Sequence, residues 1–428
     1  MTAAEIGTVI RGARAATRLT QGQLGAACGY SASAVSRIEA GSLRPGREAL
    51  LRIAVALRLR PEQLGIAPDL TRTNGGPMVG GLQSEEDAVR RRSMLAGMVG
   101  VGAALAGVPA PAAAAPAVMA DPMGPLERAL FAPKQSMPLS LPKLGGALSA
   151  AHREFTGARY AALGQRLPGL LGAAEATRDG ASGWSREQAH GAVARGYVLA
   201  TELALKQHVD LAWVAADRAL AAARASGDPV VVGEAARVLA ITMRRAGRSS
   251  AAVELLRTTA QSLYGKKGLA VGSTLLMTAA YTAACAGQRG DAMDLMGEAA
   301  QSVAGVQSAS GAELFTVEAT PAQLDLYWVG VHNALGTPDE GVRHAARINP
   351  AKLPTAERRA RLGTDTARMW HQLGDPRRTF AALRVVEQAA PEEVRRPALR
   401  ALTAGLAYGP VALPGLREFA RRTGAVPA

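Results

Sequence analysis

The sequence has few cysteines, few aromatic residues and none of the short motifs that identify common enzyme classes. Its two cysteines, Cys28 and Cys285, lie far apart and in no CxxC spacing, which excludes a disulfide framework and a cysteine-based zinc site. No GxxxxGK[ST], HExxH, GxSxG or HxE…PCxxC string occurs, and the six histidines do not cluster with carboxylates at ligand spacing. We therefore expect no enzyme activity, no metal and no cofactor.

The residues that are abundant favour helices. Aromatic residues make up 4% of the 428 residues, and runs of β-branched residues are scarce beside alanine, leucine and arginine. With 48% hydrophobic residues the chain can bury a large core. Lysine and arginine exceed aspartate and glutamate by 14. The sequence predicts an all-α, basic, intracellular protein.

The composition changes twice along the chain and predicts three segments. Residues 1–66 contain short helical patterns separated by turn residues, and residues 67–145 form a linker rich in alanine, glycine and proline. Residues 146–428 return to long helical segments that glycine or proline interrupts at intervals. We expect a five-helix domain, a linker that contains a weakly apolar helix, and a helical domain.

Capping residues mark the helices of the first segment. Thr2 and Glu5 form one capping box, and Thr20 and Gln23 form a second at the start of a short helix. Glycines 29 and 41 bound the next helix, which Ser31 is placed to cap. Two short helices joined by such a turn are typical of proteins that insert the second helix into the major groove of DNA.

This region closely resembles the Cro-like (XRE) helix-turn-helix family of phage repressors. The matching residues are Leu19-Thr20-Gln21-x-x-Leu24-Gly25, Gly29-Tyr30-Ser31-x-Ser33-x-Val35-Ser36-Arg37-Ile38-Glu39-x-Gly41 and Arg44-Pro45. The resemblance implies that six residues bind DNA. Two of them, Gln21 and Arg44, contact phosphates. The other four lie on the exposed face of the recognition helix: Ser31, Ser33, Ser36 and Arg37.

Arg37 is the residue that we expect to set base preference, because a guanidinium can bond to guanine O6 and N7 together. Ala32 departs from the family, which often has a base-reading glutamine there, so direct readout at that position is lost or passes to Ser33. By the same resemblance Arg14 and Glu39 form a structural ion pair inside the domain. We expect Cys28 to be a small buried apolar residue.

The middle segment leaves two interpretations open. Residues 90–108 resemble the charged and apolar parts of a twin-arginine signal. However, they follow a complete domain, and their apolar stretch is shorter than the roughly 20 residues that a spanning helix needs. The favoured interpretation is a small-residue helix that packs in the protein or against a partner protomer. Membrane association is the alternative.

A repeated pattern runs through the last segment. Gly247-x4-Ala252-x3-Leu256 recurs 40 residues later as Gly287-x4-Ala292-x3-Met296, and a related pattern begins at Gln207. Gly336 and Gly374 begin two further copies. Each glycine lets a helix end tightly, and each small residue lets the partner helix approach closely. The pattern resembles degenerate tetratricopeptide repeats, and the whole chain resembles actinobacterial regulators that join such repeats to a helix-turn-helix domain.

In peptide-sensing regulators related to this family, the concave face of the repeats binds a short peptide. The resemblance implies a comparable face here, with arginines and aromatic residues suited to peptide amides and carboxylates. Ordinary contacts between helices are the alternative for each residue. The candidate residues are Tyr197, Arg237, Arg244, Arg245, Tyr281, Asn333, Arg368 and His371.

These features lead to two functional hypotheses. The first is a cytoplasmic, sequence-specific transcriptional regulator that binds double-stranded DNA as a homodimer, at a pseudo-palindromic operator, and senses a peptide, small ligand or protein through its repeats. The second is a scaffold or membrane-tethered adaptor, in which DNA binding only localises the repeat domain.

Overall fold

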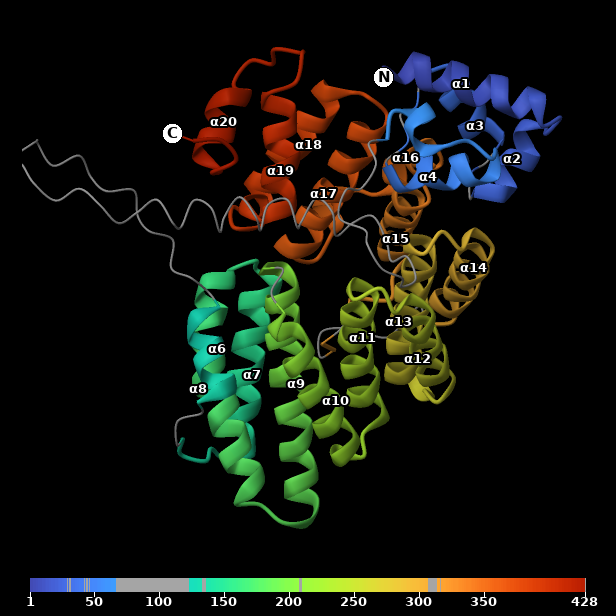
Figure 1. The fold of residues 1–428 in the computed structure, drawn as a ribbon. Coiled ribbons are helices and arrows are strands. Elements are labelled where there is room, and N and C mark those ends of the chain that lie inside the picture. The colour runs from blue at the N-terminus through green and yellow to red at the C-terminus, as the bar shows by residue number, and fades with distance from the viewer. Residues whose placement is uncertain are drawn as a thin grey trace, which may run out of the picture.

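The fold is described from a computed structural model. It describes all residues except 29, 31, 42, 44, 46, 67–122, 133–135, 208–209, 307–313, 316 and 428, and the side chains of 33, 47 and 48 are also left out. Within the described residues the regular elements are all helices, as Figure 1 shows. The predicted all-α fold is confirmed. Residues 90–108, with their proposed membrane or packing helix, lie outside the described residues.

The described part of the N-terminal domain has five short helices around one apolar core. Both predicted capping boxes form: the Thr2 hydroxyl accepts from the Glu5 amide at 3.2 Å, and the Thr20 hydroxyl accepts from the Gln23 amide at 3.1 Å. Ile10 and Leu24 are fully buried in the core. The elements are α1 (Ala3–Ala16), α2 (Gln21–Cys28), α3 (Ala32–Glu39), α4 (Arg47–Ala56) and the 3-10 helix η1 (Pro61–Leu64).

The second helical domain begins before residue 146, the boundary that the sequence predicted. Helix α6 (Gly124–Phe131) and the start of α7 (Leu141–Thr156) fall within the segment expected to be linker. Leu126 and Leu144 are fully buried in the same core as α8 (Tyr160–Asp179). The segment was predicted to be linker because it is rich in alanine and proline. The leucines of its two helices nevertheless pack against the domain.

Within the described residues, five antiparallel helix pairs follow, and four of them turn at the glycines of the repeated pattern. Gly247, Gly287, Gly336 and Gly374 have φ between +70° and +75°, a conformation that glycine adopts without strain. In Figure 1 the pairs follow one another as a curved row. The pairs are α9 (Gly183–Gln207) with α10 (Leu211–Ser226), α11 (Pro229–Arg245) with α12 (Ser249–Gln261), α13 (Gly265–Cys285) with α14 (Arg289–Gly305), α15 (Pro321–Ala334) with α16 (Pro338–Arg347), and α17 (Ala356–Gln372) with α18 (Pro376–Ala389).

The small residues of the pattern lie where paired helices come closest. Ala252 and Ala292 are fully buried, and so are Leu256 and Met296 one turn later. At Gly341, an added Cβ would lie 3.4 Å from the Cβ of His332 on the paired helix. The predicted repeat is therefore confirmed as a row of paired helices, since each pair buries its apolar face against the next.

The C-terminal part of the row folds back toward its start. Helix α17 contacts α7, and a buried network of charged side chains joins α9, α17 and the 3-10 helix η3 (Glu393–Arg395). The row then ends with α19 (Pro397–Ala407) and α20 (Leu416–Arg422). The short η2 (Pro350–Lys352) precedes α17.

One described helix, α13, is long and apolar enough to cross a membrane. Of its most apolar window, 78% is buried inside the protein. Such burial is what the core helix of a helical-repeat domain requires.

Candidate nucleic-acid interface and candidate ligand cavity

Helices α2 and α3 form the helix-turn-helix unit, and α1 fixes its angle. Gly7 of α1 lies against the end of α3, where an added Cβ would be 2.5 Å from the Ile38 carbonyl oxygen. The Arg14 guanidinium donates to the buried Glu39 carboxylate at 2.5 and 3.1 Å. The predicted Arg14–Glu39 pair is therefore confirmed as a structural contact between α1 and the end of α3.

Gln21, which the resemblance assigned to a phosphate, is the first residue of α2. Its side-chain amide donates to Glu39 at 2.9 Å, so it completes the partners of that carboxylate. Burial acts to raise the pKa of Glu39, but Arg14, Gln21 and Arg11 outweigh it and hold the pKa below its usual value. Gln21 thus holds α2 against α3 in this structure, and its phosphate contact stays a prediction.

The predicted base-reading residues lie on α3 or beside it. Ser36 is exposed, and Arg37 is half-buried because it forms an ion pair with Asp339 of α16. Ser31 and Arg44 lie outside the described residues, as does the side chain of Ser33. Cys28 is 1% exposed, and burial raises its pKa to about 11. It is the small buried residue that the sequence predicted.

A polar cavity of about 110 Å³ lies between helices of successive pairs in the repeat domain. Its walls come from α9, α11, α13, α15 and α17, together with Arg396 after η3. Basic side chains outnumber acidic ones in its lining by seven to three. The charged lining residues are Glu202, Lys206, Arg237, Arg244, Arg245, Glu357, Arg358, Arg361, Asp365 and Arg396.

Four of the eight residues that the sequence placed on a concave face line this cavity: Arg237, Arg244, Arg245 and Tyr281. The other four do not line the cavity, and their place on one concave face with these four stays a prediction.

Tyr197 lies in a different environment because it is five residues before Glu202 and on another side of α9. Its hydroxyl donates to Glu175 at 2.6 Å. Asn333 donates to the Asp365 carbonyl oxygen at 2.8 Å and is not part of the lining. Arg368 and His371 belong to the α17 surface outside the lining.

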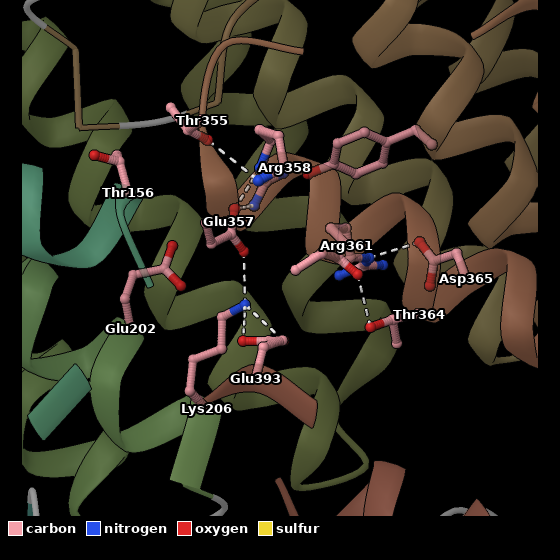
Figure 2. A network of polar contacts seen from close by, with 12 residues as sticks. Thr156, Glu202, Lys206, Thr355, Glu357, Arg358, Arg361, Thr364, Asp365 and Glu393 are labelled. Carbon is pink, nitrogen blue, oxygen red and sulfur yellow. Dashed lines mark hydrogen bonds and ion pairs between the residues drawn. The ribbon is translucent and has the colours of Figure 1, made fainter. Parts of the chain in front are cut away.

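All three acidic residues of the lining are paired, and Lys206 and Arg358 are the partners of Glu357. Arg237 donates to Glu202 at 2.6 Å, and Arg361 donates to Asp365 at 2.6 Å. Figure 2 shows the latter pair beside the network of Lys206. By contrast, Arg244 contacts the Thr282 hydroxyl at 3.2 Å and lies 4.8 Å from the Tyr281 ring centre. Positive charge in the cavity therefore exceeds what its carboxylates neutralise.

Two buried donors of the lining have no hydrogen-bond partner among the described residues. They are the side-chain amide nitrogen of Gln323, a residue that is 3% exposed, and Nε of Arg237, which is 5% exposed. Buried donors without partners are costly and are rare in folded proteins. The cavity thus presents donors and surplus positive charge, a combination suited to an anionic, hydrogen-bond-accepting group.

The sequence prediction chose Arg368 and His371 from α17, whereas other residues of this helix line the cavity. Arg358, Arg361 and Asp365 are spaced by three and four residues, which places them on one side of a helix. That spacing is visible in the sequence and could have identified them. The contribution of Lys206, Gln323 and Tyr327 could not have been found this way, because it depends on how distant helices face one another.

Comparison with known proteins agrees with the N-terminal geometry. Residues 5–64 match the family model of a helix-turn-helix domain. No curated protein matches the chain. Among solved structures, Bacillus thuringiensis PlcR in complex with the peptide PapR7 and DNA has 12% sequence identity and a TM-score of 0.30, over 89% of this chain and 99% of that chain. A TM-score this low does not assign two chains to one fold. On its own sequence and geometry, the chain joins an N-terminal helix-turn-helix domain to a domain of paired, tetratricopeptide-like helices.

Proposed function

We propose that the protein is a cytoplasmic transcriptional regulator that binds operator DNA through α3. The observation that carries this proposal is the helix-turn-helix geometry of residues 5–64, with Ser36 and Arg37 on the side of α3 away from the core. The net charge of +14 favours a polyanionic partner. As a homodimer it would bind a pseudo-palindrome whose half-sites lie about one helical turn apart.

We expect Arg37→Ala to remove base preference at one position of each half-site. Sites are first selected from a random DNA library with the full-length protein, and the affinity for the best site is then compared with that for its single-base variants. Loss of a bidentate guanine contact should cost about 1–3 kcal/mol of discrimination at that position. Because the readout is a ratio between sequences, it does not depend on how accessible α3 is.

Arg60→Ala is the matched control, since Arg60 is exposed in the same domain and far from α3 in sequence. It removes the same charge and should leave the ranking of sites unchanged. If Arg37→Ala keeps the wild-type ranking, α3 does not read bases through Arg37. If the wild type itself selects no sequence, the adaptor hypothesis replaces the regulator.

The signal that we propose for the cavity is a ligand with a carboxylate, such as the C-terminus of a short peptide. The cavity is too small for a whole peptide but has room for one small acidic group. Arg244 is the group that we expect to bind the carboxylate, because its present contacts are a hydroxyl and an aromatic ring. Gln323 would donate to the same group or to the neighbouring carbonyl.

A pool of short peptides with free C-termini should raise the melting temperature of the protein, and the same pool with amidated C-termini should not. Arg244→Ala should weaken the affinity for the free-acid peptides about tenfold or more, since hydrogen bonds to charged groups contribute about 1.5–3 kcal/mol. The rise in melting temperature should shrink accordingly. Arg257→Ala, on the exposed side of α12, is the control and should behave as wild type. Equal shifts with acid and amide pools would contradict a carboxylate site.

A further inference from the structure

The helix-turn-helix domain is bound to the repeat domain by the same side that carries Arg37. Arg37 forms an ion pair with Asp339, in the first turn of α16, and the two paired atoms are shielded from solvent. Tyr30, just before α3, lies on the turn between α15 and α16. There, a Cβ added to Gly336 would be 2.6 Å from the Tyr30 hydroxyl. Arg52 of α4 lies on the turn at Gly287, about one repeat earlier, where its guanidinium would be 3.7 Å from an added Cβ.

Three elements of the helix-turn-helix domain thus contact two successive turns of the repeat domain. These elements are the segment just before α3, α3 itself and α4. In Figure 1, α4 lies next to α16 at this side of the repeat domain, and the Arg37–Asp339 pair joins α3 to the same helix. A recognition helix needs its outer face free to enter the major groove, which admits little more than the helix itself. While Arg37 is paired with Asp339, α16 occupies the space that the base edges of the DNA would need to contact Arg37.

We propose that the turns at Gly287 and Gly336, with Asp339, form a binding surface for the chain's own helix-turn-helix domain, and that DNA competes with Asp339 for Arg37. This inference rests on the proposed DNA-binding role of α3. It adds that the described arrangement is one that excludes DNA, and that DNA binding requires the helix-turn-helix domain to leave the repeat domain.

The α15–α16 pair connects this surface to the ligand cavity. Gln323 and Tyr327, in the first half of α15, line the cavity, whereas Gly336 and Asp339 follow its other end. Trp328, His332 and His344 stack between α15 and α16, with ring centres 5.2–5.7 Å apart, so the two helices move together. A group bound in the cavity that shifts α15 would therefore also shift Asp339, which is how a ligand could release α3.

The test uses the full-length protein and two readouts. Asp339→Asn and the charge reversal Asp339→Lys should each tighten binding to the selected operator, by about fivefold for the first and more for the second, within the range of coupling between sites. They should also speed amide hydrogen exchange in residues 32–39 when no DNA is present. Glu298→Gln is the matched control, because it removes one negative charge from an exposed position of α14, more than two helical turns from the turn at Gly287. It should change neither readout.

The outcomes separate this inference from the proposed function. Tighter operator binding and faster exchange in both Asp339 variants, but not in Glu298→Gln, would support the inference. Operator binding that is sequence-specific yet equally tight in wild type and both Asp339 variants would overturn the inference and leave the regulator intact. Equal tightening by Glu298→Gln would also overturn it, because a general charge effect on DNA affinity would then suffice. Absence of any sequence preference in all variants would overturn the proposed function, and this inference with it.

Discussion

Replacing Lys206 by methionine is expected to destabilise the repeat domain by about 3 kcal/mol or more, because it breaks a buried charge network. The Lys206 ammonium lies 2.6 Å from a carboxylate oxygen of Glu357 and 3.2 Å from one of Glu393, as Figure 2 shows. Arg358 forms an ion pair with Glu357, and Arg396 forms one with Glu393. Without the ammonium, the two buried carboxylates repel each other across the space that it occupied.

Because this network joins the two ends of the repeat row, its loss should destabilise the whole repeat domain. Lys206 belongs to α9, near the start of the repeat row, whereas Glu357 and Glu393 lie near its end. The Tyr160 hydroxyl of α8 also donates to Glu393, at 2.5 Å. Chemical denaturation followed by circular dichroism measures the change. Lys143→Met, at an exposed position of α7, is the control and should cost almost nothing.

The pH dependence provides a second signature of the same network. Burial acts to raise the pKa values of both glutamates, but Arg358, Arg396 and Lys206 outweigh it. The pKa of Glu393 is lowered to about 2, and that of Glu357 is held well below its usual range. Because these folded-state pKa values are depressed, their stabilisation is complete above the usual value of 4.5 and is lost as the pH falls toward 2.

In Lys206→Met the two pKa values should rise, so acid unfolding should begin at a higher pH than in wild type. The double variant Lys206→Met/Glu357→Gln removes the repulsion and should recover part of the lost stability. Wild-type stability and wild-type acid unfolding in Lys206→Met would show that the lysine does not bridge the two ends of the row.

The repeats were predictable because their pattern is local. A helix that ends in a tight antiparallel turn needs a residue with positive φ, and a closely packed pair needs a small residue at a fixed distance from that turn. Gly247 and Ala252 satisfy both needs within a few residues, and the need recurs in each pair. The capping boxes of the N-terminal domain were predictable for the same reason.

The cavity and the domain contact were not predictable, because each depends on helices that are distant in sequence. Arg37 and Asp339 are separated by some three hundred residues, and nothing near either residue indicates the other. The concave face was assigned from helical register alone, and an error of a fraction of a turn moves a side chain to another surface. Tyr197 packs against Glu175 and does not line the cavity.

Gly7→Ala is expected to destabilise the helix-turn-helix domain by about 3 kcal/mol, the upper end of the usual cost of overpacking, and to abolish operator binding. The added methyl carbon would lie 2.5 Å from the carbonyl oxygen of Ile38 and 2.8 Å from that of Glu39. These neighbours are backbone atoms at the end of α3, so no side-chain rotation relieves the clash. Helix α1 must move, and α3 with Ser36 and Arg37 loses its support.

Gly12→Ala is the control that isolates this contact, because it makes the same substitution later in the same helix, where an added Cβ meets no atom of the described residues within 4 Å. It should stabilise the domain by about 0.5–1 kcal/mol, since alanine favours helix over glycine. Hydrogen exchange resolved by segment measures both variants: Gly7→Ala should lose protection in α1 to α4 and keep it in α9 to α18. A domain of this size is only marginally stable, so a loss of about 3 kcal/mol should be detectable. A Gly7→Ala variant with wild-type protection and wild-type operator affinity would mean that α1 does not fix the position of α3.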